Sequence, residues 1–319
     1  MPDLLLWGGV FVLTLATLIF AANYFIQASE RIGLGLGIPP FVIGVTLVAL
    51  GTSLPELITS ILAVIADSSE IVLGNVVGSN ISNICLILGL TSIFAGKIDM
   101  KFDVMAVDLP MVIGSTFLLG LMVMDGVFLA FEGWLLLSGF VLYLAYVVLS
   151  GRETRAAHPE TKEALAARPK IRWTVYLILL ASGVGIYFSA AYNVESIIRL
   201  SEILGIGKEV ISLTVVALGT SLPELVVSLA AIRTGNTEIA VGNVLGSNIF
   251  NIFGVMGISS LFGSIVVPES ILNFSLPMLI VSSLMTFFII QTRTISRWAG
   301  WILVMFYALF IGNLIASLI

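Results

Sequence analysis

The decapeptide VALGTSLPEL occurs twice in this chain, at Val48–Leu57 and again at Val216–Leu225. Around it, 14 of 19 positions are identical when residues 42–60 are compared with residues 210–228. A second motif repeats at the same offset along the chain, as GNVVGSNISN at 74–83 and as GNVLGSNIFN at 242–251. Because the offset does not drift between the two motifs, the sequence predicts two halves that share one fold.

The composition predicts that both halves lie in a membrane. Of the 319 residues, 59% are hydrophobic and only 10% are charged, whereas a soluble domain carries about 25% charged residues. A spanning helix needs about 20 mostly apolar residues. Reading for such stretches gives ten candidate spans, and the fold class is therefore an all-α integral membrane protein. The spans are residues 4–27, 39–65, 70–94, 104–124, 127–150, 171–194, 208–232, 238–263, 270–291 and 296–318.

The cations lie almost entirely on one side of these spans. Counting spans places all but two of the Lys and Arg residues on the side that holds the polar connector, and only Arg199 and Lys208 on the other. Basic loops stay in the cytoplasm. We therefore expect a cell-membrane protein with a cytoplasmic connector, residues 151–170, and with both termini extracellular. The cations on the connector side are Arg31, Lys97, Lys101, Arg152, Arg155, Lys162, Arg168, Lys170, Arg172, Arg233, Arg293 and Arg297.

Five spans in each half determine the relation between the halves. We expect a first five-helix repeat in residues 1–150 and a second in residues 171–319. Because five is odd, the second repeat must enter the membrane from the opposite side, so the two repeats are inverted. Inverted repeats are typical of secondary transporters, whose site lies near the midplane where broken helices meet. Two such halves can exchange conformations, which favours transport by alternating access.

The repeated decapeptide predicts a helix break lined by oxygen atoms. Pro55 and Pro223 each remove a helix hydrogen bond, and irregular backbone at membrane depth is tolerated only where it is buried or lines a cavity. The break would bring together freed carbonyls, the hydroxyls of the Thr-Ser pairs and the carboxylates of Glu56 and Glu224. These groups comprise Thr52, Ser53, Glu56, Thr220, Ser221 and Glu224.

Two carboxylates in lipid require neutralisation. A charge at the bilayer centre costs about 2.5–3.5 kcal/mol on insertion scales, and a bound cation removes that cost. Calcium takes six to eight oxygen ligands, and sodium accepts the same atoms. Soft transition metals prefer Cys or His, which both motifs lack. An anionic substrate is disfavoured because neither motif contains Lys or Arg.

The second motif predicts the opposing wall of the site. Gly74, Gly78, Gly242 and Gly246 recur at four-residue spacing, which is typical of close helix packing. Close packing would also bring polar side chains of both copies toward the carboxylates. These are Asn75, Ser79 and Asn83 in the first half and Asn243, Ser247 and Asn251 in the second.

Together, the twin GTSLPE segments, each followed by a GN-x-x-GSN motif, resemble the alpha-1 and alpha-2 repeats of sodium/calcium exchangers, within the calcium/cation antiporter superfamily. The resemblance covers essentially the whole chain, with the alpha-1 motif at 42–90 and the alpha-2 motif at 210–258. It implies a multi-pass antiporter that exchanges Na+ for Ca2+, and it implies a stoichiometry of three to one. It also implies that the first and sixth helices slide across the rest as a gate.

The resemblance also implies ion ligands. Calcium would be held by Glu56 and Glu224 with the backbone carbonyls of Thr52 and Thr220. One outer sodium site would use Ser79, Ala217, Thr220, Ser221 and Glu224, and its inverted counterpart would use Ala49, Thr52, Ser53, Glu56 and Ser247. A middle site would use Asn83 and Asn251 beside the glutamates. Some relatives carry aspartate at the place of Asn251, so the centre here holds two formal charges rather than three.

Other functions remain open on the sequence. A calcium/proton antiporter would reprotonate the two glutamates, a potassium-dependent exchanger would co-transport K+, and a calcium channel would need no counter-ion. An enzyme is disfavoured, since no H-E-x-x-H or G-x-S-x-G motif occurs and the only histidine, His158, lies in the connector. The expected partners are Na+, Ca2+ and the lipid bilayer. We expect no cofactor, no nucleic acid and no obligatory protein partner.

Overall fold

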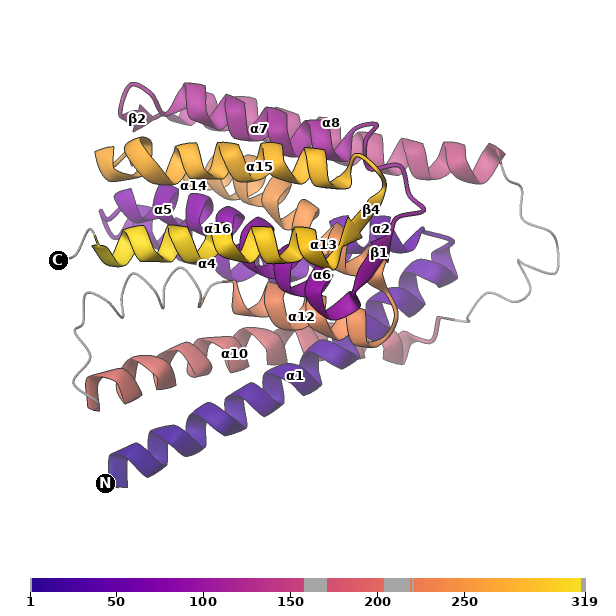
Figure 1. The fold of residues 1–319 in the computed structure, drawn as a ribbon, viewed down its shortest axis with the longest axis horizontal. Coiled ribbons are helices and arrows are strands. Elements are labelled where there is room, and N and C mark those ends of the chain that lie inside the picture. The colour runs from indigo at the N-terminus through magenta and orange to yellow at the C-terminus, as the bar shows by residue number, and fades with distance from the viewer. Residues whose placement is uncertain (1, 158–170, 204–218, 220, 317–319) are drawn as a thin grey trace.

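The computed structural model describes residues 2–157, 171–203, 219 and 221–316, and in these residues the protein is a helical bundle (Figure 1). Most helices run along one common direction. Helices α1 and α10 slant along one side of the others, in contact with each other. His158 and the rest of the connector to residue 170 lie outside the described residues, as do Lys208, Ala217 and Thr220.

The first half contains α1 (Pro2–Leu36), a broken second span, and three further helical segments. The broken span consists of α2 (Pro40–Ile43), the π-helix η1 (Gly44–Val48), α3 (Ala49–Thr52) and α4 (Leu54–Ile65). After it come α5 (Glu70–Ile81), the π-helix η2 (Ser82–Leu88), α6 (Gly89–Ala95), strand β1 (Lys97–Asp99), α7 (Asp108–Met122), strand β2 (Val127–Phe128) and α8 (Ala130–Ala157).

The second half repeats this order. Its described elements are α10 (Trp173–Ile203), α12 (Leu222–Arg233), α13 (Thr237–Phe250), the π-helix η3 (Asn251–Met256) and α14 (Gly257–Ser259). Strand β3 (Ile265–Val266), the π-helix η4 (Ile271–Ser275), α15 (Leu276–Ile290), strand β4 (Thr294–Ser296) and α16 (Arg297–Ala316) complete it.

The described helices include seven that are long and apolar enough to cross a membrane, and an eighth if the bent pair Pro40–Thr52 and Leu54–Ile65 is one span. The other two predicted spans correspond to shorter described helices, α7 with 15 residues and α12 with 12. Every predicted span therefore coincides with a helical segment, although much of the seventh, before Leu222, lies outside the described residues. Helix α8 continues to Ala157, past the predicted end of its span at residue 150.

Two small antiparallel sheets reveal the inversion of the halves. Strand β1 pairs with β4, and β2 pairs with β3. Adding the sequence offset between the repeats to the residue numbers of β1 gives numbers that overlap those of β3, and adding it to those of β2 gives numbers that overlap those of β4. Each sheet is therefore the symmetry counterpart of the other. They lie at opposite ends of the bundle (Figure 1), as two halves related by an axis in the membrane plane require.

The GN-x-x-GSN segments form the centre of the molecule. In the most apolar 18 residues of the span Thr237–Ser259, 100% are buried, and in those of Glu70–Ala95 83% are buried, against 11% for α1. Small Gly, Ser and Asn side chains let these two segments pack tightly inside the bundle. The long apolar helices α1, α8, α10 and α16 lie outside them and expose many large apolar side chains, as lipid-facing helices do.

Candidate functional site

The predicted helix break is present in both halves with the same geometry. Ser53 leaves the helical conformation with φ −90° and ψ 8°, and the span bends by 41° there. Ser221 has φ −88° and ψ 4°. A new helix starts directly after each serine, with the proline in its first turn. Pro55 has no N–H to donate to the carbonyl of Gly51, four residues earlier, so this carbonyl loses its usual helical partner.

Each break places one glutamate in the first turn of a helix. Glu56 lies in the first turn of α4 and Glu224 in the first turn of α12, and both are 0% exposed. The amino end of a helix carries a partial positive charge from its unpaired N–H groups. This partial charge stabilises a carboxylate, but it does not neutralise one.

The two halves are joined directly at these carboxylates. The Ser53 hydroxyl donates to Glu224 Oε1 at 2.9 Å. The resemblance groups Ser53 with Glu56, whereas the structure points its hydroxyl at the glutamate of the other half. Because the two half-helices face each other across the symmetry axis, a side chain one turn before Glu56 reaches the opposite carboxylate.

Several oxygen atoms at the breaks and beside them have no hydrogen-bond partner in the part of the chain that the structure describes. Both carboxylate oxygens of Glu56 are buried without one, as are Glu224 Oε2, Ser221 Oγ and Ser247 Oγ, among the residues that the structure describes. Buried polar atoms are almost always paired, and an unpaired buried charge is far more costly than a neutral group. The described part of the chain contains no buried Lys or Arg. None of the described basic side chains is therefore the missing partner.

Two asparagines donate hydrogen bonds to the backbone carbonyls of the two glutamates. Asn75 Nδ2 donates to Glu56 O at 3.2 Å and to Ser60 Oγ at 3.0 Å. The repeat reproduces both bonds, from Asn243 Nδ2 to Glu224 O at 3.4 Å and to Ser228 Oγ at 2.9 Å.

The side-chain oxygen atoms (Oδ1) of the same two asparagines are also part of this region. Thr52 Oγ1 donates to Asn243 Oδ1 at 3.2 Å, which links the first break to the second half. The Oδ1 atom of Asn75 is buried without a partner among the described residues. Ser60 and Ser228 are not apparent from the sequence as members of the site, although both end the stretch of compared positions.

Four asparagines form a second polar layer, and their hydrogen bonds join the two halves. Asn83 Nδ2 donates to Asn248 Oδ1 at 3.2 Å, and Asn251 Nδ2 donates to Asn80 Oδ1 at 3.1 Å. Asn83 and Asn251 lie at the start of the π-helices η2 and η3, a feature that is frequent at functional sites. Their Oδ1 atoms are buried and unpaired among the described residues. Sequence reasoning missed Asn80 and Asn248, although both are the last residue of the repeated GSN triplet.

The predicted ion ligands that the structure describes fall into two groups. Thr52, Ser53, Glu56, Ser221 and Glu224 lie at the two breaks. The others, all buried on the neighbouring segments, are Ala49, Ser79, Asn83, Ser247 and Asn251. Ala217 and Thr220 lie outside the described residues, so their positions stay a prediction.

The glycines of the second motif differ in what surrounds them. A Cβ added at Gly246 would lie 2.4 Å from Val45 O, and one at Gly242 would lie 2.5 Å from Phe41 O. Helix α13 therefore crosses the backbone of α2 and η1 closely at these two positions. At Gly74 the nearest atom would be Ile271 Cδ1 at 3.4 Å, an ordinary contact. Gly78 is buried in α5.

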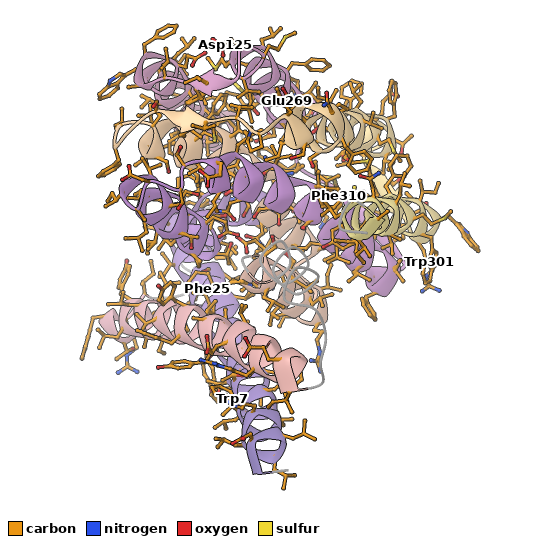
Figure 2. The ribbon with its side chains drawn as sticks, turned by 90° about the vertical axis from the view of Figure 1, so that its left-hand side faces the viewer. Trp7, Phe25, Asp125, Glu269, Trp301 and Phe310 are labelled. Atoms are coloured by element: carbon orange, nitrogen blue, oxygen red, sulfur yellow. The ribbon has the colours of Figure 1, made fainter. Side chains whose placement is uncertain are left out.

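Helices α1 and α10 cover the site on one side. A Cβ added at Gly51, beside the first break, would lie 2.6 Å from Phe25 Cζ of α1, and one at Gly219 would lie 2.6 Å from Val194 Cγ2 of α10. Figure 2 shows Phe25 nearer to the bulk of the bundle than Trp7 on the same helix. Asn193 Nδ2 of α10 donates to Thr14 Oγ1 of α1 at 3.0 Å, which joins the pair.

Comparison with known proteins identifies this arrangement. The sequence profile of the family described as sodium/calcium exchanger protein matches residues 6–149 and 174–316, once in each half. The chain belongs to the sodium/calcium exchanger family. It is therefore a multi-pass membrane transporter of the cation antiporter class and not an enzyme.

Individual proteins align along most of the chain. The sodium/calcium exchanger MaX1 of Methanosarcina acetivorans is 37% identical, over 95% of this chain and 96% of its own length. The inner membrane protein YrbG of Escherichia coli is 34% identical over 81% of this chain and 80% of its own. A solved structure of the sodium-calcium exchanger NCX_Mj, soaked with Na+ and Ca2+, matches with a TM-score of 0.82 and 31% identity, covering 96% of this chain and 98% of that one.

Proposed function

We propose that this exchanger moves Ca2+ against Na+ by alternating access, with both ions bound in turn between Glu56 and Glu224. The observation that carries the proposal is the pair of fully buried carboxylates with three oxygens unpaired among the described residues. A charge buried without a partner is costly, and a bound cation offsets that cost. Exchange follows, because one cation can leave only when another replaces it.

The donor set favours hard cations. Carboxylate, amide, hydroxyl and carbonyl oxygens are the atoms that Ca2+ takes, in groups of six to eight. The proposed calcium ligands are Glu56 and Glu224, with the backbone carbonyls of Thr52 and Thr220. The described residues contain no group of three His, Cys, Asp or Glu side chains that could hold a metal ion. Neutral oxygens therefore complete the shell, which suits an ion that must be released in every cycle.

Sodium would use the oxygens around the same carboxylates. The proposed positions are an outer site at Ser79, Ala217, Thr220, Ser221 and Glu224, its counterpart at Ala49, Thr52, Ser53, Glu56 and Ser247, and a middle site beside Asn83 and Asn251. Ser221 Oγ and Ser247 Oγ, together with the Oδ1 atoms of Asn83 and Asn251, are unpaired among the described residues, as ligands awaiting an ion would be.

The charge of the site bears on the stoichiometry. Two carboxylates balance one Ca2+ or two Na+, because asparagine rather than aspartate stands at position 251. A third Na+ makes the sodium-loaded carrier positive. The resemblance to sodium/calcium exchangers implies an exchange of three Na+ for one Ca2+. With this site charge, such an exchange moves net charge in each cycle and responds to the membrane potential.

The proposed topology follows from the distribution of basic residues. The end of the bundle with β1 and β4 carries Lys97, Lys101, Arg293 and Arg297, which we assign to the cytoplasm with the connector at 151–170. Both termini are then extracellular. The repeats are residues 1–150 and 171–319.

The test is a sodium jump on proteoliposomes loaded with Ca2+, with and without a pH gradient. Calcium release that follows the inward Na+ gradient and ignores the pH gradient supports the proposal. Release driven by protons alone would instead establish the calcium/proton antiporter, a requirement for K+ the potassium-dependent variant, and release without any counter-ion a channel. Setting the membrane potential with K+ and valinomycin measures the net charge moved.

A further inference from the structure

A crevice away from the carboxylates opens between α1, α12 and the edge of α6. Its volume is about 680 Å3. Helix α12 lines it with Leu225, Val226 and Leu229, and α1 lines it with Leu15 and Ile19. The α6 side chain at its rim, Phe94, is 67% exposed. These walls are apolar and lie at membrane depth, so lipid chains rather than water reach them.

One end of this crevice carries a cation. Arg233 is the last residue of α12, lines the crevice and is exposed. It has no ion-pair partner among the residues that the structure describes. By contrast, Arg199 pairs with Glu195 at 2.9 Å, and Arg293 pairs with Asp103 at 2.6 Å. The guanidinium of Arg233 is therefore available to an anion, and its fork of N–H groups suits a phosphate.

The length of the crevice corresponds to one leaflet of the bilayer. The lining residues of α12 run from Leu222 to Arg233. At 1.5 Å per residue this helix rises about 16 Å, which is about half of the roughly 30 Å hydrocarbon core. A group at Arg233 thus lies at the headgroup level when the inner end of the crevice lies near the midplane. Leu222, at that inner end, is two residues from Glu224.

The geometry points to an anionic phospholipid as the occupant of this crevice, with its phosphate on Arg233 and one acyl chain between α1 and α12. Charge complementarity selects the headgroup, and the apolar walls accept the chain. Arg233 lies on the side that the positive-inside rule assigns to the cytoplasm, where anionic lipids attract basic residues. The bound chain lies between α1 and the helix that carries Glu224.

A second crevice in the protein provides an internal comparison. It measures about 540 Å3 and lies against α3, α4 and α10, where Leu54, Ile58 and Tyr187 contribute to its walls. Its lining contains no Lys or Arg among the residues that the structure describes. A lipid chain there has no cation to select its headgroup, so its occupancy is independent of headgroup charge.

Photocrosslinking tests the assignment without relying on transport. The full-length protein is reconstituted with phosphatidylglycerol or phosphatidylcholine that carries a diazirine in the middle of one acyl chain. Labelled peptides are then quantified by mass spectrometry. One basic residue near the surface contributes about 1 kcal/mol to anionic lipid binding, which is about fivefold in occupancy. We expect phosphatidylglycerol to label residues 222–233 about fivefold more than phosphatidylcholine, and to label residues 54–58 equally.

Three variants complete the test. Arg233→Gln should lower phosphatidylglycerol labelling of residues 222–233 to the phosphatidylcholine level. Arg297→Gln, which changes an exposed arginine outside the crevice, should leave it unchanged. Leu229→Trp should lower labelling by both lipids, because the larger side chain fills the crevice. Equal labelling of residues 222–233 by the two lipids would overturn the assignment. So would phosphatidylglycerol labelling that Arg233→Gln leaves undiminished, or labelling by either lipid that Leu229→Trp leaves undiminished. Monodisperse elution and an unchanged melting temperature verify that each variant is folded.

Discussion

Replacing Glu56 by glutamine removes one of the two buried charges and keeps the shape of the side chain. Both of its carboxylate oxygens lack a hydrogen-bond partner among the described residues, so no hydrogen bond to them is lost. The cost of an unneutralised charge in the membrane is about 2.5–3.5 kcal/mol. If cation binding relieves that cost, the variant loses the same amount of binding free energy. At about 1.4 kcal/mol for each tenfold change, calcium affinity falls about 60- to 300-fold.

The assay is thermal unfolding of the purified protein across a calcium titration. At a calcium concentration of about 100 times the wild-type Kd, binding stabilises the wild type by about 2.7 kcal/mol. At the same concentration, the weakened variant is stabilised by less than about 0.6 kcal/mol. Without calcium, Glu56→Gln should be the more stable protein, because it no longer buries an unpaired charge. The matched control is Glu70→Gln, an exposed glutamate in the first turn of α5, which should behave as wild type. If calcium stabilised Glu56→Gln as much as the wild type, the charge of Glu56 would not hold the cation.

Three further substitutions and one control substitution test other parts of the protein. Ser53→Ala removes the hydroxyl that donates to Glu224, so calorimetric titration should show calcium binding weakened by about 1.5–3 kcal/mol. Calcium affinity equal to that of the wild type would show that this hydrogen bond does not orient the carboxylate. Gly246→Ala should destabilise the protein by about 1–3 kcal/mol, because the new Cβ meets Val45 O. The control Gly74→Ala should be neutral or stabilising by up to about 1 kcal/mol. Equal melting temperatures for the two variants would show that the contact of the new Cβ with Val45 O is not costly. Asn251→Asp cannot donate a hydrogen bond to Asn80 and adds a third negative charge to the site. Its melting temperature without cations should therefore fall, and its melting temperature should rise more steeply with calcium concentration than that of the wild type. An unchanged melting temperature without cations would exclude a stabilising role for the Asn251 hydrogen bond.

The sequence predicted the architecture because its strongest signals are long-range and repeated. The constant offset between the two copies of each motif required two equivalent halves, and the odd number of spans required their inversion. The broken second span was predicted correctly, since Pro55 in an apolar helix removes a backbone hydrogen bond wherever the helix would otherwise continue. The paired glutamates followed from the same repeat.

The remaining features depend on contacts between the halves, which no local pattern encodes. Strands β1 and β4 are far apart in the chain and pair only because inversion brings two loops to one end of the bundle. The cross-axis bonds of Asn80 and Asn248 have the same origin. The hydrophobic periodicity of the sequence also does not reveal the π-helical turns at Asn83 and Asn251. Adding one residue per turn does not change the pattern of a segment that is apolar on most sides. For this reason, repeated polar residues indicated which side chains belong to the site but not which partners they face.

The proposed exchange rests on one divalent cation that is held jointly by Glu56 and Glu224. Anomalous diffraction from crystals soaked with Sr2+, a heavier analogue of Ca2+, measures this directly. We expect a peak within direct coordination distance of carboxylate oxygens from both residues, close to the roughly 2.3–2.6 Å that Ca2+ adopts. A peak bound to only one of the two glutamates, or a peak elsewhere with none between them, would contradict it.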